Sequence, residues 1–134
     1  MKALKKILLF LVNWVWQLPQ NLLGLCYYSM VKKSISETLQ PYKAGYSIYL
    51  KESKGGVSLG KYIFVPVDSC NLHFLIQHEA GHNRQSRMLG PLYLLVIGIP
   101  SFLWALVHRR WFSEKDYYWF YTESWANKLA NLKR

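Results

Sequence analysis

The sequence of 134 residues predicts an α+β fold, on three observations. Residues 46–51 alternate between two kinds of side chain before a Gly-Gly turn and a second strand at 57–67, residues 70–88 form a helix that a Gly-Pro pair ends, and two long runs carry no charge. A chain of this length builds one core. We therefore expect a membrane-associated segment, residues 1–33, followed by one folded domain, residues 34–134, with a second apolar segment at 88–107.

The charge of the chain is strongly positive and unevenly distributed. Seventeen Lys and Arg stand against seven Asp and Glu, a net charge of +10, whereas residues 7–31 and 88–107 have no charged side chain. Positive charge beside apolar, aromatic-rich segments attracts an anionic lipid surface, at roughly 1 kcal/mol per well-placed Lys or Arg. No basic stripe, zinc-finger spacing or stacking-sheet motif is present. We expect membrane lipids as partners and no nucleic acid.

The first uncharged run, residues 7–31, is long enough to span a bilayer, but polar residues interrupt its middle. These are Asn13, Gln17, Pro19, Gln20 and Asn21. They leave two apolar pieces of about ten residues, a length that suits a re-entrant hairpin or an interfacial helix. No small-residue cleavage site follows a short apolar stretch, which argues against a removable signal peptide.

The next segment predicts a β-hairpin. Tyr46, Ile48 and Leu50 alternate with polar or exposed neighbours, Lys54-Gly55-Gly56 supplies a turn, and Val57 to Val67 form the second strand. Pro66 ends this strand and places it at an edge of the sheet.

Two helices are expected after the hairpin. The first, residues 70–88, begins at a cap formed by Asp68 or Ser69 and stops at Gly90-Pro91. The second, residues 114–131, has Ser113 as its N-cap, acidic residues in its first turn and basic residues near its end.

The first of these helices carries the pattern HExxH, as His78-Glu79-Ala80-Gly81-His82. Residues four apart lie on one face of a helix, so both imidazoles can reach one zinc ion, and Glu79 lies where a carboxylate can take the proton from a metal-bound water. The alternative is two ordinary helical histidines. Gly81 favours a functional site, because a glycine inside a helix costs ~1 kcal/mol and usually permits the close approach of another segment.

A catalytic zinc needs a third protein ligand, and Glu123 on the last helix is the best candidate. Asn127 follows it one turn later and can hydrogen-bond a ligand imidazole to orient it. The alternative for Glu123 is an exposed helical glutamate that pairs with Lys128 or Asn127.

HExxH followed by an ExxAD-like segment resembles the gluzincin metallopeptidases, particularly the membrane-bound prenyl-protease and heat-shock-protease group. Over residues 55–130 the chain is more closely similar to small uncharacterised bacterial membrane proteins with this motif pair. Their likeness lies in three stretches, His78 to Ser86, Leu89 to Leu94 and Tyr121 to Ala126.

This resemblance implies a minimal zincin-like fold that holds one zinc ion through His78, His82 and Glu123, with Glu79 as the general base. Asn127 departs from the peptidase pattern, which has aspartate there. A neutral amide can orient a histidine, but it does not raise the basicity of the ring as a carboxylate does.

An oxyanion-stabilising group is sought among the remaining polar aromatics. His108 and Tyr121 are secondary candidates for this role, with Tyr117 and Tyr118 as further alternatives to Tyr121.

If His82 and Glu123 bind one ion, the chain between them must leave this ion and return to it, and this part of the chain contains the second apolar run. Two crossings of a bilayer need about 40 apolar residues, and residues 88–107 supply 20. The run is therefore a broken hairpin in one leaflet, as Gly98 and Pro100 indicate, or a helix buried in protein, or the metal lies within the membrane. Lys residues flank both ends of the first run, so we expect the site at the cell membrane on its cytoplasmic side.

The leading hypothesis is a membrane-associated zinc-dependent peptidase that hydrolyses a peptide bond by metal-activated water. Its substrate, a peptide or a membrane protein, is expected to lie as an added strand along the sheet edge near Val57 to Val65. One alternative is a catalytically inactive, metal-stabilised membrane protein that acts as a structural or partner-binding module. Another is a metal-free basic protein of the membrane surface.

Overall fold

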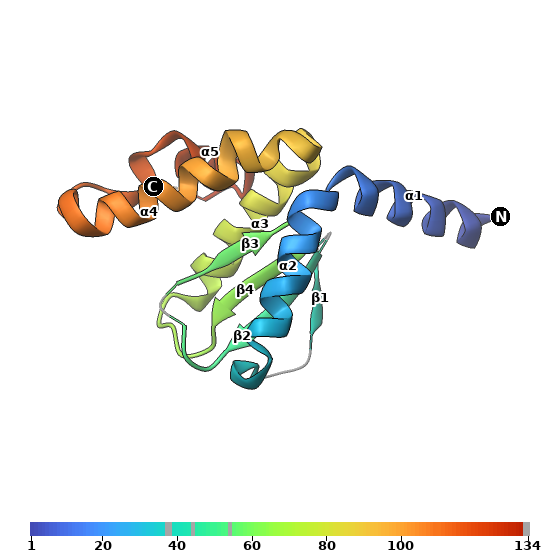
Figure 1. Ribbon diagram of the computed structural model, residues 1–134, viewed down its shortest axis with the longest axis horizontal. Coiled ribbons are helices and arrows are strands. Elements are labelled where there is room, and N and C mark those ends of the chain that lie inside the picture. Colours follow the sequence, from blue (N-terminus) through green and yellow to red (C-terminus); the bar gives the residue numbers. More distant parts are fainter. Residues whose placement is uncertain (37–38, 44, 54, 133–134) are drawn as a thin grey trace.

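The computed structural model describes residues 1–36, 39–43, 45–53 and 55–132, and it confirms the α+β class. In these ranges five α-helices surround a four-stranded mixed sheet with the strand order β1-β2-β4-β3. The strands are β1 (Gln40–Tyr42), β2 (Gly45–Leu50), β3 (Val57–Leu59) and β4 (Tyr62–Pro66). The helix α2 (Leu18–Met30) covers one face of the sheet and α3 (Leu72–Leu89) covers the other (Figure 1).

The inner strand β4 carries the core because helices cover both of its faces. Successive side chains of a strand point to opposite faces. Phe64 therefore packs with Ile48 on the α2 side, whereas Ile63 packs with Ile76 on the α3 side. A strand that is buried on both faces appears in the sequence as a continuous apolar run, which is how β4 appears.

The predicted hairpin around the Gly55-Gly56 turn is wrong; Lys54 of that turn lies outside the described residues. β2 and β4 pair in parallel, and the antiparallel hairpin is formed by β3 and β4 around Gly60. Gly60 has a φ of 62°, a left-handed conformation that suits a tight reversal. Pro66 ends β4 as predicted. The predicted position of this strand at an edge of the sheet is wrong, because β4 is an inner strand and its neighbour β3 forms the edge.

The division of the first apolar run is confirmed, since α1 (Lys2–Trp16) and α2 are separated at Gln17. Gln17, Gln20 and Asn21 of this region are buried and hydrogen-bonded. Gln20 donates to Ser86 Oγ at 2.9 Å, and the Asn21 side-chain oxygen accepts from the backbone N–H of Lys61 at 2.8 Å. These bonds attach α2 to the end of α3 and to the β3–β4 turn, whereas α1 has no buried residue.

The second apolar run forms a continuous helical path, so the broken-hairpin prediction is wrong. A 3₁₀ turn (Gly90–Leu92) and a π-helical turn (Leu94–Gly98) lead into α4 (Ile99–Trp111). Pro100 lies in the first turn of α4, where a proline is tolerated. Among the helices that the structure describes, none combines the length and the apolar character needed to cross a membrane.

Two helix boundaries differ from the prediction. α3 begins at Leu72 with no side-chain cap, because the Ser69 hydroxyl accepts instead from the Asn71 N–H at 3.2 Å. The last helix, α5, spans Tyr121–Leu129 and begins later than Glu114. The predicted N-cap Ser113 is wrong: α5 follows Phe120, and Asp116, expected inside the helix, instead caps the short 3₁₀ turn Tyr117–Trp119.

α3 and α5 pack most closely at Gly81, which confirms the close approach predicted from this glycine. A Cβ atom at Gly81 would collide with the backbone carbonyl of Ala126 in α5. Because His82 follows Gly81 and Glu123 precedes Ala126 by three residues, this contact sets the distance between the two helices that carry the ligands.

We expect Gly81→Ala to lower the free energy of unfolding by about 1–3 kcal/mol, because the added methyl forces the two helices apart. This loss should exceed the ~1 kcal/mol that alanine contributes to helix propensity. Denaturant unfolding measures the change. Gly55→Ala is the control, since a Cβ atom there meets open space. Equal stability of both variants and the native chain would contradict the close helix contact.

Candidate metal centre

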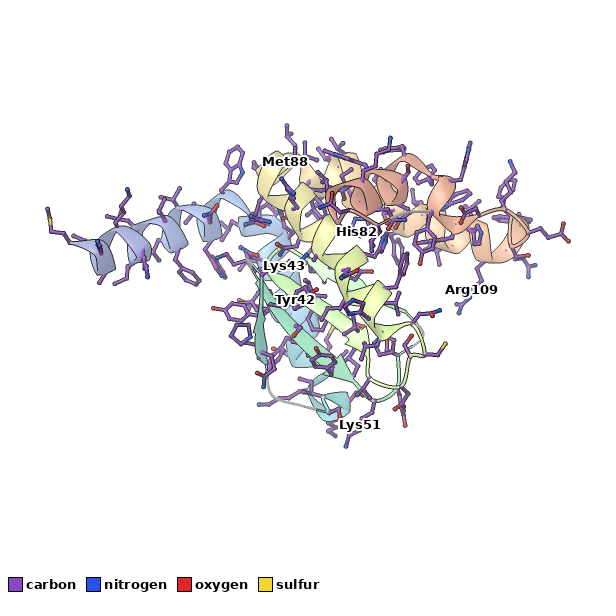
Figure 2. All side chains as sticks on the ribbon, turned by 180° about the vertical axis from the view of Figure 1, so that it is seen from behind. Tyr42, Lys43, Lys51, His82, Met88 and Arg109 are labelled. Atoms are coloured by element: carbon purple, nitrogen blue, oxygen red, sulfur yellow. The ribbon has the colours of Figure 1, made fainter. Side chains whose placement is uncertain are left out.

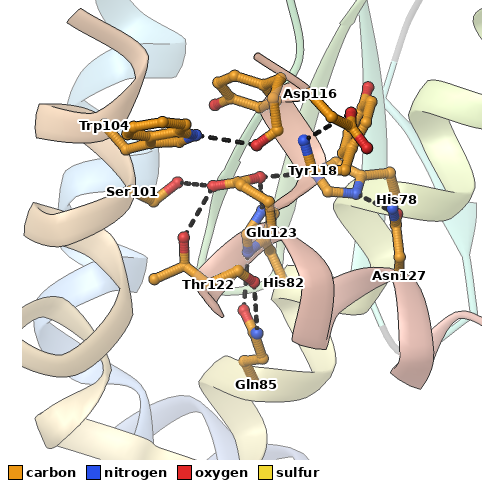
Figure 3. A network of polar contacts seen from close by, with 11 residues as sticks. His78, His82, Gln85, Ser101, Trp104, Asp116, Tyr118, Thr122, Glu123 and Asn127 are labelled. Carbon is orange, nitrogen blue, oxygen red and sulfur yellow. Dashed lines mark hydrogen bonds and ion pairs between the residues drawn. The ribbon is translucent and has the colours of Figure 1, made fainter. Parts of the chain in front are cut away.

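Three side chains from two helices, α3 and α5, converge on one point. His78 and His82 come from consecutive turns of α3, and Glu123 comes from the first turn of α5. All three are buried, and their ligand atoms lie within 4.8 Å of one another. Figure 3 shows the Glu123 carboxylate between the two imidazoles. The predicted meeting of the paired histidines with this glutamate is confirmed, and the group could hold one metal ion.

One oxygen of Glu123 contacts both rings. Its Oε2 lies 2.9 Å from His78 Nε2 and 3.0 Å from His82 Nε2, and the two rings are nearly perpendicular, with an interplanar angle of 85°. The other oxygen, Oε1, accepts hydrogen bonds from Thr122 Oγ1 at 3.0 Å and from Ser101 Oγ of α4. Three helices therefore fix the orientation of this carboxylate.

The hydrogen bonds of Gln85 determine which nitrogen of His82 carries a proton. Gln85 Nε2 donates to the Thr122 carbonyl at 3.0 Å, so its Oε1 is the atom that faces His82 Nδ1 at 2.7 Å. Nδ1 must then donate, and on a neutral imidazole Nε2 keeps a lone pair. This lone pair faces Glu123 Oε2, and two acceptors at such a distance need a proton or a metal cation between them. The site is built around a positive charge.

The second imidazole is oriented in the same manner. His78 Nδ1 lies 2.7 Å from Asn127 Oδ1, one helical turn beyond Glu123. Asn127 thus lies where the sequence prediction placed it. The corresponding partner of His82, Gln85, was not predicted, although its position three residues after His82 on the same helix is a signal that could have revealed it.

The ionisation of the site shows how strongly these groups interact. Burial lowers the pKa of His82, but the hydrogen bond and charge of Glu123 outweigh burial and raise that pKa to about 9. Burial alone would raise the pKa of Glu123, yet the two imidazoles and the Ser101 hydroxyl hold it far below its ordinary value. The carboxylate is therefore ionised and ready to bind a cation.

Glu79 lies on the same cavity but outside the ligand cluster. The cavity has a volume of about 680 Å³ and is bounded by α3, α4, the β3 edge and the Tyr117–Tyr118 turn. A Cβ atom at Gly56 would lie 2.6 Å from Glu79 Oε1, so this carboxylate packs directly on glycine backbone. Burial, above all other effects, raises the pKa of Glu79, while the nearby histidines oppose the shift. A carboxylate with a raised pKa beside a metal site is suited to proton transfer.

The two secondary candidates for an oxyanion contact do not line this cavity. His108 Nε2 lies 2.6 Å from the Lys115 carbonyl, and the Tyr121 hydroxyl donates to the Val96 carbonyl at 2.7 Å. Tyr117 and Tyr118 do line it, and the Tyr118 ring packs edge-on against His78 with centroids 5.0 Å apart. Sequence alone could not separate these tyrosines, because the 3₁₀ turn that orients them was not predicted.

Comparisons with protein-family models, curated proteins and solved structures find no match to this chain. The interpretation of the site therefore rests on its own donors. Two imidazole nitrogens and one carboxylate oxygen form the His2Glu set that holds zinc in catalytic sites. The structure meets the demands of that set, because the amide oxygens of Asn127 and Gln85 hold both Nδ1 atoms and turn both Nε2 atoms toward Glu123.

Metal content provides the direct test of this centre. We expect the purified chain to bind one equivalent of zinc and Glu123→Ala to lose most of it, because two imidazoles alone form an incomplete site. Elemental analysis of the two proteins after identical purification measures the difference. Glu52→Ala, at an exposed acidic position, is the control. Zinc retention in Glu123→Ala would exclude the carboxylate as a ligand.

Proposed function

We propose that this chain is a membrane-associated zinc-dependent peptidase with a minimal zincin-like fold of the gluzincin type. The observation that carries the proposal is the convergence of His78, His82 and Glu123 on one point with Glu79 on the wall of the same cavity. A His2Glu donor set beside an additional buried carboxylate is the arrangement that metal-assisted peptide hydrolysis requires.

The β3 edge supports a peptide as the substrate. β3 pairs with β4 on one side only, and Val57, Ser58 and Leu59 line the cavity together with Glu79. Ser58 Oγ is buried and has no hydrogen-bond partner among the described residues. An extended peptide added antiparallel or parallel to this edge would hydrogen-bond the unpaired backbone groups of β3, and its own backbone would pass the candidate metal centre. We therefore propose that the peptide binds along residues 57–59, which are only part of the edge, residues 57–65, expected from the sequence.

The residues around the cavity have distinct tasks in such a reaction. A zinc ion, when bound by the three ligands, supplies a Lewis acid that polarises a carbonyl and acidifies water. Glu79 accepts the proton from the attacking water and passes it to the leaving amine. Asn127 and Gln85 keep the two imidazoles in the tautomer that leaves Nε2 free to bind a metal.

The surface of the helices supports membrane association. In Figure 1, α1 and α4 extend to opposite sides at the same end of the sheet. Both expose apolar residues in numbers unusual for a surface in water; those of α4 are Ile99, Phe102, Leu103, Leu106 and Trp111. We place the site on the cytoplasmic side of the cell membrane. Labelling of the exposed Lys51 from outside intact cells would contradict this placement.

Replacement of the proposed base tests the peptidase function. We expect zinc-loaded protein to cleave members of a mixed peptide library and Glu79→Gln to lose about 10²- to 10⁴-fold in rate, because the amide cannot accept a proton. Mass spectrometry of the library measures cleavage. Zinc content should stay unchanged in this variant, and Glu114→Gln, at an exposed acidic position, should retain activity. Equal cleavage by Glu79→Gln and the native chain would contradict the proposed role of Glu79 and with it the peptidase proposal.

A second candidate function is a catalytically inactive membrane protein whose metal site joins its helices or recruits a partner. Asn127 favours it, because the amide orients His78 without adding the negative charge that a carboxylate would bring. The site then serves stability rather than chemistry.

The two functions predict opposite outcomes for one pair of variants in cells that need the protein. An inactive module should tolerate Glu79→Gln but fail with His78→Ala, which removes a metal ligand, whereas a peptidase should fail with both. Complementation of a deletion strain reads out the result, and immunoblotting confirms that each variant accumulates. Loss of the role in both well-expressed variants would eliminate the inactive module.

A further inference from the structure

Three basic side chains gather where α1 meets the end of α3 and the β3–β4 turn. Lys61 lies in that turn and is only 7% exposed, although it carries a charge. Arg87, in the last turn of α3, is partly buried, and its Nε has no hydrogen-bond partner within the part of the chain that the structure describes. Arg84 lies one turn earlier on the same helix. Burial and Arg87 lower the pKa of Lys61, and burial and Arg84 lower the pKa of Arg87, so Arg87 lies close enough to both neighbours to repel them.

Among the described residues no ion pair compensates these charges, although Arg84 donates to the Leu129 carbonyl at 3.3 Å. Among the residues that the structure describes, neither Lys61 nor Arg87 forms an ion pair, and the closest recorded partner of Lys61 Nζ is the Phe10 ring, 4.2 Å from its centroid. Burying a charge is costly unless a partner compensates it. The cluster therefore calls for an anion that is not part of the described chain.

The space beside Arg87 indicates what kind of anion fits. A hollow of about 630 Å³ separates α1 from the end of α3, and most of its wall is apolar. The wall includes Val12, Val15, Trp16 and Pro91, with Arg87 as its one charged group. Trp16 fixes this arrangement, because its indole N–H donates to the Arg87 carbonyl at 2.9 Å and its ring packs on Gly90. A ligand for this hollow has an anionic head and a hydrocarbon part.

We propose that the junction of α1 with α3 binds the phosphate headgroup of an anionic phospholipid, with Arg87 on the wall of the hollow as the charged contact and Lys61, which lies outside that wall over the Phe10 ring, as a second nearby charge. α1 then lies at the lipid surface with its apolar side chains toward the lipid chains, which accounts for a helix that exposes most of its apolar side chains and has no buried residue. A bilayer is favoured over free phosphate because the apolar wall is of no use to an inorganic ion. The net charge of +10 also matches an anionic surface. The site goes beyond the peptidase proposal and does not depend on it.

Vesicle binding by the full zinc-loaded chain tests this lipid site. The probes are phosphatidylcholine vesicles with and without phosphatidylglycerol. We expect the native chain to prefer the anionic vesicles, and Lys61→Gln and Arg87→Gln each to weaken that binding about fivefold. The double variant should lose about 30-fold if the two contacts add. Lys61→Arg and Arg87→Lys keep the charge and should retain most of the binding.

The control is Lys51→Gln, which removes one charge at an exposed position. In Figure 2, Lys51 lies at the end of the sheet opposite to Met88, which marks the end of α3. We expect it to weaken binding less than twofold. An equal loss in Lys51→Gln and Arg87→Gln would show a mere effect of net charge and overturn the proposal. Indifference of the native chain to phosphatidylglycerol would overturn it as well.

Two further measurements separate the lipid from other occupants. Thermal unfolding in inorganic phosphate tests the free ion: stabilisation by phosphate without vesicle binding would assign the site to a soluble anion and overturn the lipid proposal. Sedimentation tests a second copy of the chain, and self-association that buries α1 and abolishes vesicle binding would also overturn it. Thermal unfolding also checks folding, since removal of an uncompensated buried charge should leave Lys61→Gln at least as stable as the native chain.

Discussion

The contact of one carboxylate oxygen with two imidazoles is the constraint on which the rest of this structure depends. Glu123 Oε2 meets His78 and His82 within 3.0 Å, although more than forty residues separate it from either ring in the sequence. α3 and α5 must approach so closely that only a glycine fits at position 81. The chain between them must also return past Ser101, which holds the other oxygen of the carboxylate. The helical path through α4 exists within these limits.

α3 connects this centre to the surface that we assign to the membrane. His82 lines the cavity, and Arg87 lies five residues later on the same helix, about 7.5 Å along the helix axis. Gln20 of α2 donates a hydrogen bond to Ser86 near the same end of α3. Trp16, the last residue of α1, donates one to the Arg87 carbonyl there. If α1 lies at a lipid surface as proposed, α3 would fix the distance of the candidate metal centre from the lipid. Peptide segments that leave the bilayer surface would then be the nearest substrates of the proposed peptidase, which fits the apolar residues that α4 contributes to the cavity.

The site was more predictable from the sequence than the fold. The spacing of His78 and His82 fixes their common face, and the glycine at 81 signals a close neighbour, since both effects act within one helix turn. The pairing of β2 with β4 was missed because parallel strands meet through a long connection, and local turn residues such as Gly55-Gly56 carry no information about it. Ser101 gave no signal, since its role exists only once α4 lies beside α5.

The charges of the centre bear on whether Asn127 permits catalysis. A divalent cation held by the three ligands would face one ionised carboxylate among them, Glu123, and a second carboxyl group, Glu79, on the cavity wall. An aspartate at position 127 would add a further negative charge at a position that is 5% exposed, where an uncompensated charge is costly. The amide keeps the hydrogen bond to His78 and the neutrality of the buried group. With a cation bound, a more weakly basic His78 would leave that cation a stronger Lewis acid, so Asn127 is compatible with the proposed hydrolysis as well as with the inactive module.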